Sequence, residues 1–557
     1  MNARHLRVTA AVASLALALA AGATALNPAF AAGSASDAML KPVKTKQGLV
    51  QGTAGEQPGV TAFRGIPFAA APVGELRFRE AQAPKPWTGV RDASKWGDTC
   101  IQPSGKTRPI GVNQAVDMPD SPKMSEDCLN LNVWTPAKSA GAKLPVMVWF
   151  YGGAYAEGGG SMPFANGANL AKKGVIVVSL NYRVGAFGFL SSSELTAASP
   201  HHASGNQALS DSIAALQWVK ANIAAFGGDP NNVTIFGQSA GACITAALVG
   251  SPVAKGLFQK AISESGAWAG LTAAKMVTRE DAEKRTAEAM EKAGVHSLAE
   301  LQALPADQVA KLGRAQGIIV DGWIVPEDQS ITFAQGKQNK VAVLLGSNGN
   351  EGGSFGPPGG ANVTAEAWKA GAAQRWKDLA DLGLKAYPAA TDAEAKAASS
   401  RPFTDGIAWF MHRYASDQAK VGQPAYLYQF VRTPASAPGK TNGGASHASE
   451  LAYVFNNLDK PREVPDNSDP AVVSQSAPDI KLADQISSYW TNFAKTGNPN
   501  GSGLPNWPQV TKMASNQAML LDVNSHVGDT MTPEQVALYD ALYERDVAKP
   551  LGLKNWK

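Results

Sequence analysis

A serine flanked by glycines stands where the sequence predicts that a strand turns into a helix. The motif Gly237–Gly241 (Gly-Gln-Ser-Ala-Gly) follows the β-branched and aromatic run Val233–Phe236 and precedes the apolar run Ala242–Val249. A strand–turn–helix setting holds a serine at a strained backbone angle, and glycines two residues to either side prevent backbone collisions there. The five-residue pattern is common by itself, but in this setting it predicts that Ser239 is a nucleophile.

A serine hydroxyl needs a base to take its proton, and in sites of this kind the acid and then the histidine follow the serine in the chain. Four histidines lie downstream of Ser239. His412 falls in a helical pattern, and His296 precedes the better acid candidate. His447 lies in a loop of small residues, whereas His526 follows a predicted strand. The spacing alone leaves His447 and His526 as alternatives.

Two acids are candidates to orient that histidine. Glu351 follows the predicted strand Val341–Leu345 through a turn rich in glycine and asparagine, at the carboxyl end of the strand, where such sheets collect their active sites. Asp321 follows the apolar run Ile318–Val320 and competes with it. Either carboxylate could hold the imidazole in one tautomer and stabilise the imidazolium.

A glycine-rich turn supplies candidate donors for an oxyanion. Gly152, Gly153 and Ala154 directly follow the predicted apolar strand that ends at Tyr151. Hydrolases with such an elbow carry an oxyanion loop at this position, and small side chains leave the backbone N–H groups open to a ligand.

These residues need a scaffold of parallel strands, and the rest of the chain has the pattern for one. Short apolar runs alternate with helical patterns such as Asn206–Ala225, and near-continuous apolar runs such as Val175–Val178 are typical of strands covered on both faces. The alternation predicts a large, mostly parallel central sheet with helices on both faces. Together with the serine elbow, this sheet predicts the α/β-hydrolase fold. The expected strands are Pro145–Tyr151, Val175–Asn181, Val233–Phe236, Lys260–Ser263, Val341–Leu345, Ala425–Val431 and Ala518–Val523.

Two stretches, at about 278–312 and 365–418, are helical and charge-rich without intervening strands. We expect them to be helical insertions over the active site that form walls of a substrate pocket. No linker or internal repeat divides the remainder, so residues 32–557 are expected to form a single domain.

The N-terminal segment has the three parts of a secretory signal peptide. Arg4 and Arg7 precede the small-apolar run Val8–Ala21, and Ala29-Phe30-Ala31 offers a cleavage site after Ala31. A cut after Ala25 is the alternative. We therefore expect residues 1–31 to be removed and the protein to be secreted or periplasmic.

Composition excludes several classes of partner. The formal net charge is +4, with no basic run or stripe, so neither nucleic acid nor an anionic membrane is expected as a partner. No other apolar run has the ~18 residues that a membrane span requires. The three cysteines lack the paired spacing of a metal or redox site, so no metal is expected.

The sequence resembles the type-B carboxylesterase and cholinesterase family. The resemblance covers nearly all of the chain after the signal segment and is carried by several specific motifs in order. Besides the serine motif, these are Phe63–Ala69, Pro72–Gly74, Ser125–Val133, Asn181–Gly188 and Phe226–Pro230.

The resemblance also implies roles for individual residues. Gly346–Gly352 looks like the family's acid loop, which selects Glu351, and Ser446–Leu451 looks like its histidine loop, which selects His447. Further features that the resemblance implies are oxyanion donors at Gly153, Ala154 and Ala240, a disulfide between Cys100 and Cys128, the ion pairs Arg77–Glu126 and Arg183–Asp211, and support of the triad by Ser265.

Three departures point away from cholinesterases. Ala154 stands where the family often has a third glycine, and its methyl group is expected to narrow the tolerance for bulky esters. Gln238 stands where cholinesterases have a carboxylate. The segment between Cys100 and Cys128 contains no aromatic residue that could hold choline by a cation–π contact.

The expected function is that of a serine carboxylesterase acting on a small-molecule ester through an acyl-enzyme, without metal or organic cofactor. One alternative is a non-catalytic binding protein on the same scaffold, which the complete set of triad residues disfavours. The other is the same triad acting on amides or thioesters, which the sequence does not distinguish.

Overall fold

The structure is a computed structural model that describes residues 37–103, 122–312, 316–354, 363–434, 444–459, 476–554 and 556. By its internal contacts the chain divides into Met1–Ala35 and Ser36–Lys557, and the described residues all belong to the second unit. The predicted signal peptide, residues 1–31, lies outside the described residues. Among the helices that the structure describes, none combines the length and apolar character needed to cross a membrane.

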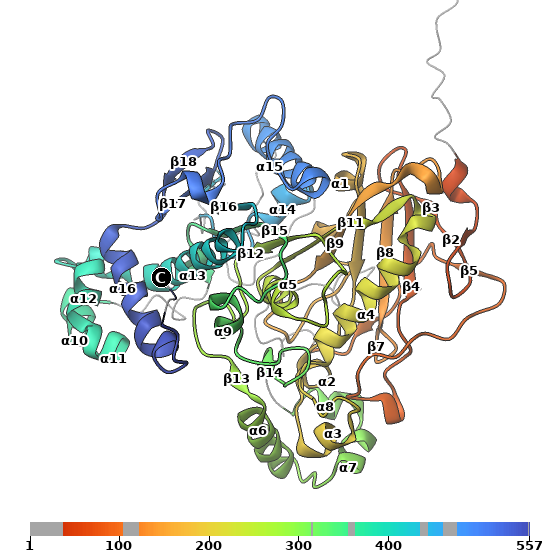
Figure 1. The fold of residues 1–557 in the computed structure, drawn as a ribbon, viewed down its shortest axis with the longest axis horizontal. Coiled ribbons are helices and arrows are strands. Elements are labelled where there is room, and N and C mark those ends of the chain that lie inside the picture. The colour runs from red at the N-terminus through yellow and green to blue at the C-terminus, as the bar shows by residue number, and fades with distance from the viewer. Residues whose placement is uncertain are drawn as a thin grey trace, which may run out of the picture. The chain divides into compact units, whose positions relative to one another are not determined.

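The described residues form an eleven-stranded sheet in the order β18-β17-β16-β15-β12-β11-β9-β10-β8-β4-β3 (Figure 1). The seven strands from β17 to β10 pair in parallel, and antiparallel pairs lie at both edges. The strand bounds are β3 Thr53–Ala54, β4 Thr61–Pro67, β8 Asn130–Thr135, β9 Leu144–Phe150, β10 Ile176–Leu180, β11 Gly228–Gln238, β12 Lys260–Glu264, β15 Ala342–Asn348, β16 Ala425–Phe430, β17 Gln517–Leu521 and β18 His526–Asp529.

The seven parallel strands are the seven that the sequence predicts, so the expected mostly parallel sheet is confirmed. All five residues of β10 are buried, as its near-continuous apolar run requires. The edge strands have weaker patterns: β4 contains a glycine and a proline, and β18 is a four-residue strand with exposed ends. Short or mixed strands of this kind give little periodicity from which to predict them.

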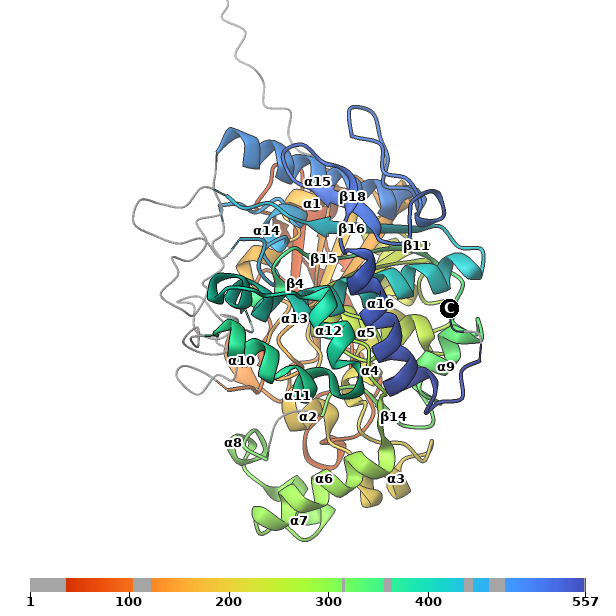
Figure 2. The same ribbon diagram turned by 90° about the vertical axis from the view of Figure 1, so that its left-hand side faces the viewer.

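Helices cover both faces of the sheet. In Figure 2, α1 (Ala168–Lys172) and α15 (Ala477–Thr496) lie on one side, and α4 (Gln207–Asn222), α5 (Ala240–Gly250) and α13 (Asp392–Lys420) lie on the other. Local sequence sets their ends: Ser476 caps the N-terminus of α15, and Gly497 ends it with a φ of 78°. The sheet is thus buried between two helical layers, which confirms the α/β-hydrolase architecture.

The two helical stretches each have a small apolar core of their own. Met290, Leu301 and Val309 pack with Phe187, and Trp368, Trp376 and Tyr387 belong to a second cluster. The helices are α6 Arg279–Lys292, α7 Leu298–Ala303 and α8 Ala306–Val309 in the first stretch, and α10 Ala365–Ala370, α11 Ala372–Trp376, α12 Ala380–Ala386 and α13 in the second.

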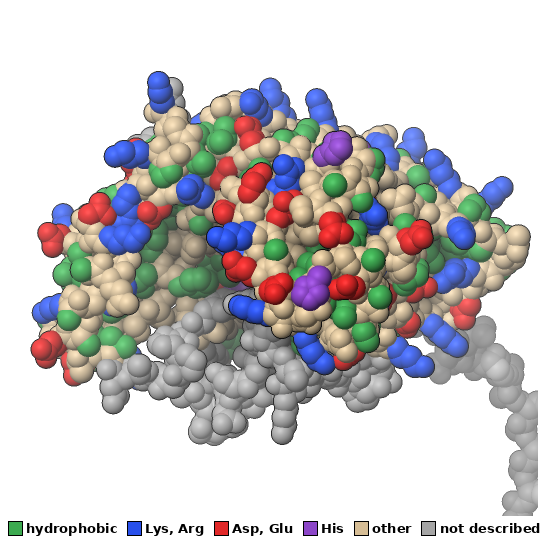
Figure 3. Space-filling model, turned by 90° about the horizontal axis from the view of Figure 1, so that it is seen from below, with side chains coloured by type: hydrophobic (Ala, Val, Ile, Leu, Met, Phe, Trp, Pro, Cys, Tyr) green, Lys and Arg blue, Asp and Glu red, His purple; other side chains and the backbone are tan. Residues whose placement is uncertain are grey.

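The remaining described strands and α-helices are short, apart from α16, and lie in connections or in small sheets. They are β1 Val43–Lys44, β2 Leu49–Gln51, β5 Val90–Asp92, β6 Thr99–Cys100, β7 Met124–Ser125, β13 Val277–Thr278, β14 Ile319–Val320, α2 Gly185–Phe189, α3 Ser193–Ala198, α9 Gln329–Ala334, α14 Leu451–Val454 and α16 Pro533–Tyr543. On the face seen in Figure 3, positive and negative side chains are interspersed among the described residues, as the near-neutral composition predicts.

Candidate active site

Ser239 occupies the turn between β11 and α5, where the sequence places it. Its backbone has φ 57° and ψ −124°, a strained combination for a residue with a side chain, and only 8% of the residue is exposed. A Cβ at Gly241 would lie 2.0 Å from the carbonyl oxygen of Phe150, and one at Gly237 would lie 2.5 Å from Gly241 itself. Both glycines are therefore required by the tight turn, which is the geometry of a nucleophile elbow.

Glu351 and His447 meet although 96 residues separate them in the chain. Glu351 is fully buried at the start of the 3₁₀ turn Glu351–Ser354 after β15, and its Oε2 lies 2.5 Å from Nδ1 of His447. Its other oxygen accepts hydrogen bonds from Oγ of Ser265 (2.5 Å) and from the backbone N–H of Asn348 (2.7 Å). Three partners thus hold this carboxylate in one orientation, so it can orient the imidazole in turn.

The loops that carry the acid and the histidine are joined by their backbones. Asn350 and Ser446 form a parallel β-bridge, and the N–H of Asn350 donates to the carbonyl of Ala445 (2.9 Å). The N–H of His447 donates to Oγ of Ser354 at 3.2 Å. The contact between carboxylate and imidazole therefore rests on a local framework as well as on its own hydrogen bond.

Nε2 of His447 faces Gln238, the residue before Ser239. The two Nε2 atoms are 3.2 Å apart. With the Nδ1 proton donated to Glu351, Nε2 of the neutral ring is an acceptor, so the hydrogen-bond network assigns the Gln238 amide as its donor. Among the described residues, no hydrogen bond joins Oγ of Ser239 to His447. The sequence motif indicates nothing about this contact, because it joins residues 209 positions apart.

The loop Gly152–Tyr155 packs against the elbow. A Cβ at Gly152 would lie 3.0 Å from Cβ of Ser239, and Gly153, Ala154 and Tyr155 have consecutive positive φ values of 121°, 50° and 63°. Within the described part of the chain, the N–H groups of Gly153, Ala154 and Ala240 donate to no other group. Unpaired N–H groups on a strained loop and at a helix N-terminus beside a serine are suited to bind an oxyanion.

The rival residues from the sequence lie in other environments. His526 is exposed in β18, where its Nδ1 lies 2.9 Å from the carbonyl of Asn524. His412 is in α13, with Nε2 2.9 Å from Oγ1 of Thr530, and burial lowers its pKa to about 4. His296 is exposed in the turn between α6 and α7. None of the three contacts Ser239, Glu351 or His447 in the described hydrogen-bond network.

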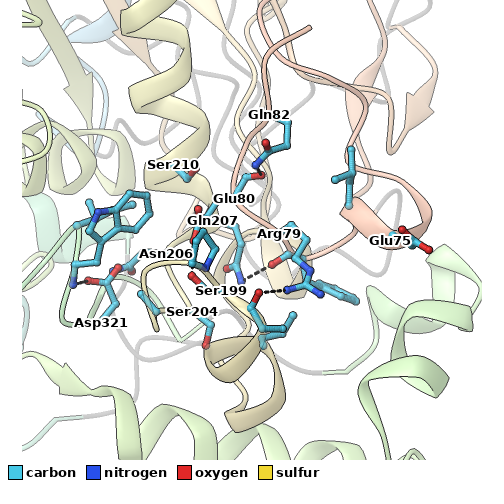
Figure 4. A pocket seen from close by; sticks show the side chains of 18 residues that line it. Glu75, Arg79, Glu80, Gln82, Ser199, Ser204, Asn206, Gln207, Ser210 and Asp321 are labelled. Atoms are coloured by element: carbon cyan, nitrogen blue, oxygen red, sulfur yellow. Dashed lines mark hydrogen bonds between the residues drawn. The ribbon is translucent and has the colours of Figure 1, made fainter. Parts of the chain in front are cut away.

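Asp321, the rival acid, lines a separate cavity of about 300 Å³ beside the N-terminus of α4 (Figure 4). Oδ1 of Asp321 accepts from the N–H groups two and four residues further on, at 2.9 and 2.8 Å, while burial raises its pKa. Glu80 accepts from Oγ of Ser199 at 2.5 Å, and Gln207 donates to two backbone carbonyls. Asp321, Glu80 and the Gln207 N–H₂ group thus have partners in the chain, while Oε1 of Gln207 finds none among the described residues.

The sequence reasoning missed two further buried carboxyl groups, Glu450 near His447 and Glu264 near Glu450. Glu450 accepts from Nδ2 of Asn348 at 2.5 Å, and Glu264 accepts from Nε1 of Trp490 at 2.7 Å. Burial raises the pKa of both groups, to about 7 for Glu450. Among the described residues, one oxygen of each finds no hydrogen-bond partner. The position of Glu450, three residues after the histidine, was the signal that could have drawn attention to it.

The covalent and ionic features implied by the resemblance are present. Cys100 and Cys128 form a disulfide, and Cys243 is a buried free thiol whose pKa burial raises to about 12. A thiol with such a pKa is almost wholly unionised at neutral pH and is a poor nucleophile. Ion pairs join Arg77 to Glu126 (Nε–Oε2 2.7 Å) and Arg183 to Asp211 (Nη2–Oδ1 2.7 Å). No cluster of three potential metal ligands occurs among the described residues.

An α/β-hydrolase sheet with a serine elbow, a paired acid and histidine and open backbone donors defines a hydrolase of the serine-esterase class. The sequence agrees: the model of the carboxylesterase family matches residues 40–539, and the chain therefore belongs to the carboxylesterase family, whose members hydrolyse carboxylic esters.

Esterases are among the relatives that the chain resembles, and the similarity covers most of each chain. Fumonisin B1 esterase of Sphingopyxis macrogoltabida is 35% identical and covers 88% of each chain, and para-nitrobenzyl esterase of Bacillus subtilis (strain 168) is 36% identical over 86% of this chain and 94% of the relative. Among solved structures, a PNB esterase superposes with a TM-score of 0.76 at 33% identity, covering 90% of this chain and 99% of that one.

Proposed function

We propose that this carboxylic-ester hydrolase works through a Ser239–His447–Glu351 triad with an acyl-enzyme intermediate. The observation that carries the proposal is the arrangement of His447, whose Nδ1 is held by the buried Glu351 while its Nε2 is directed to the residue adjoining Ser239. An imidazole placed in this way can take the proton of a serine hydroxyl.

The reaction proceeds in two symmetrical halves. Oγ of Ser239 attacks the ester carbonyl carbon as Nε2 of His447 takes its proton, and the imidazolium is stabilised by the Glu351 carboxylate. The carbonyl oxygen becomes an oxyanion that accepts hydrogen bonds from the N–H groups of Gly153, Ala154 and Ala240. The C–O bond then breaks, and Nε2–H protonates the leaving alcohol. Water attacks the acyl-enzyme by the same route and releases the acid and free Ser239.

The test compares the purified protein with its Ser239→Ala variant on nitrophenyl esters of short and medium chain length. We expect kcat to fall by about 10⁶-fold, while circular dichroism and the melting temperature stay close to those of the parent protein. A fluorophosphonate probe should label the parent protein and not the variant. Equal turnover by both proteins, or no turnover of any ester by the parent, would refute the triad. Amide and thioester substrates in the same panel define which acyl compounds the site accepts.

We also propose that the enzyme is exported, with cleavage after Ala31. The basic start, apolar run and small-residue cleavage site in residues 1–31 support this. Expression with the native N-terminus, followed by mass spectrometry of the culture medium and periplasm, should find a protein that begins at Ala32. A protein that keeps residues 1–31 and stays in the cytoplasm would contradict the proposal.

A further inference from the structure

Gln238 is the side chain that contacts both the histidine and the loop of candidate oxyanion donors. It is 3% exposed and is the last residue of β11, where it is paired in register with Glu264 of β12. A Cβ at Gly152 would lie 2.9 Å from Oε1 of Gln238 and 2.8 Å from its backbone oxygen. The side-chain amide is therefore confined between the Gly152 backbone on one side and His447 on the other.

The chemistry of an amide suits both states of the histidine. Its N–H₂ group donates to the unprotonated Nε2 of the neutral ring, which is the contact seen at 3.2 Å. After a half-turn about the Cγ–Cδ bond, its oxygen can accept from a protonated Nε2. A carboxylate at this position could accept from the imidazolium but could not donate to the neutral ring, and a thioether cannot donate and accepts only weakly.

The contact between Gln238 and His447 also explains why Ser239 has no hydrogen bond to His447 in this structure. In this structure Nε2 of His447 is bonded to Gln238 and not to Ser239, so the ring must exchange one partner for the other before it can act as a base. The exchange replaces one neutral hydrogen bond with another, so its net cost is small and ester binding can drive it. Hydrogen bonds in the free enzyme are often looser than in the complex with substrate, which fits such a resting arrangement.

We propose that Gln238 is a positioning residue for the esterase reaction, which holds the neutral, Nδ1-protonated form of His447 between turnovers and hands Nε2 to Ser239 when an ester binds. This inference rests on the proposed roles of Ser239 and His447. Its action is through the histidine, because the structure shows the Gln238 amide against His447 and Gly152.

The test uses two near-isosteric variants, Gln238→Glu and Gln238→Met, and follows kcat and kcat/KM for a nitrophenyl ester from pH 5 to 9. Gln238→Glu replaces the donor with an acceptor that favours the imidazolium, so the acid limb of kcat/KM should move to higher pH by about one unit. Gln238→Met removes, without adding charge, the hydrogen bond that competes with Ser239 in the free enzyme, so the limb should move less, while KM falls by about fivefold and kcat stays unchanged. The other carboxyl groups around His447, Glu351 and Glu450, and Glu264 beside them are the same in every variant.

Gln418 provides the matched control. It is a fully buried glutamine in α13 whose Nε2 donates to the backbone carbonyls of Asn339 and Val341, at the opposite end of β15 from Glu351. Gln418→Met should lower the melting temperature without moving the acid limb. If both Gln238 variants lower stability in the same way and keep the parent's pH profile and KM, Gln238 is only a packing residue and the inference is wrong.

Failure of the inference can be separated from failure of the triad. A parent protein that hydrolyses esters and loses activity in Ser239→Ala, together with Gln238 variants that have the parent's pH profile, overturns only the role of Gln238. A parent protein that does not react with the fluorophosphonate probe overturns the proposed function, and the role of Gln238 with it.

Discussion

The surroundings of Ser239 and the cavity beside Glu80 both gather polar groups in buried positions, but they differ in how those groups are satisfied. In the cavity, Asp321 and Glu80 accept hydrogen bonds from nearby groups of the chain. Beside Ser239, the N–H groups of Gly153 and Ala154 have no partner in the described chain, and the backbone is held at positive φ. Unsatisfied donors and strained backbone cost stability and persist where they serve a reaction.

The comparison indicates that unpaired backbone N–H groups are a better guide to the reactive site in this protein than the presence of a cavity. In the cavity of about 300 Å³ both carboxylates have partners within the chain, although Oε1 of Gln207 has none among the described residues, so we expect Asp321 and Glu80 to affect stability. The elbow and its loops leave N–H donors open, so we expect their residues to affect turnover. Four predictions test this division, beginning with the largest effect.

The first concerns the base. His447→Ala should lower kcat by about 10⁶-fold, because Ser239 then has no group to take its proton. His526→Ala should leave kcat unchanged, since His526 is exposed in β18 and contacts the carbonyl of Asn524. Steady-state hydrolysis of a nitrophenyl ester measures both. Loss of activity in His526→Ala alone would reverse the assignment.

The second compares the two acids directly. Glu351→Gln keeps the shape of the side chain but removes the charge that stabilises the imidazolium, and kcat should fall by about 10⁴-fold. Asp321→Asn should lower the melting temperature and leave kcat unchanged, because Asp321 holds a turn beside the cavity. Kinetics and thermal unfolding of the two variants form a matched pair. If Asp321→Asn impairs turnover in a fully folded protein, the division between the two regions fails.

The third concerns stability and pH. Burial raises the pKa of Glu450 from its ordinary value of 4.5 to about 7. At a pH between these two values the carboxyl group is protonated in the folded protein and releases its proton when the protein unfolds. The folded state therefore loses stability as the pH rises through this window. Removing the charge in Glu450→Gln should stabilise the protein at pH 8 by on the order of 2–3 kcal/mol and have little effect near pH 4.5.

Urea unfolding at pH 4.5 and pH 8 measures this difference. The exposed Glu366→Gln in α10 is the control and should show no such dependence. An equal stabilisation at both pH values would mean that the charge of Glu450 is not the cause.

The fourth and smallest effect concerns Ala154. Ala154→Gly keeps the N–H donor, relieves a non-glycine residue at φ 50° and removes a methyl group beside the oxyanion position. The ratio of kcat/KM for an ester with a branched acyl or alcohol group to that for a small ester should rise by up to about tenfold. An unchanged ratio would show that the methyl group does not limit access.

Local sequence predicts the frame of this protein well. The seven parallel strands were predictable because each is a buried apolar run, and the elbow was predictable because Gly237 and Gly241 are needed next to Ser239. Edge strands such as β18 were missed because four residues with exposed ends carry no clear period.

The choice between Glu351 and Asp321 was not predictable from local pattern, because both follow apolar runs. It depended on family resemblance. The structure shows that Asp321 accepts from N–H groups of its own turn, whereas Glu351 reaches a histidine 96 residues away. The contact of Gln238 with His447 and the contacts of the buried carboxyl groups join residues that are far apart in the chain. A local stretch of sequence therefore cannot predict them.

The long sequence separation between Gln238 and His447 also has a kinetic consequence. The site draws on the loop after β9, the turn after β11, the loop after β15 and the loop after β16, so it is complete only when these segments have docked. Contacts across 209 residues form slowly, because the chain must close a long loop before they stabilise it. During synthesis the proposed nucleophile is thus made about two hundred residues before the proposed base. Recovery of esterase activity on refolding should accordingly report one of the last steps of folding.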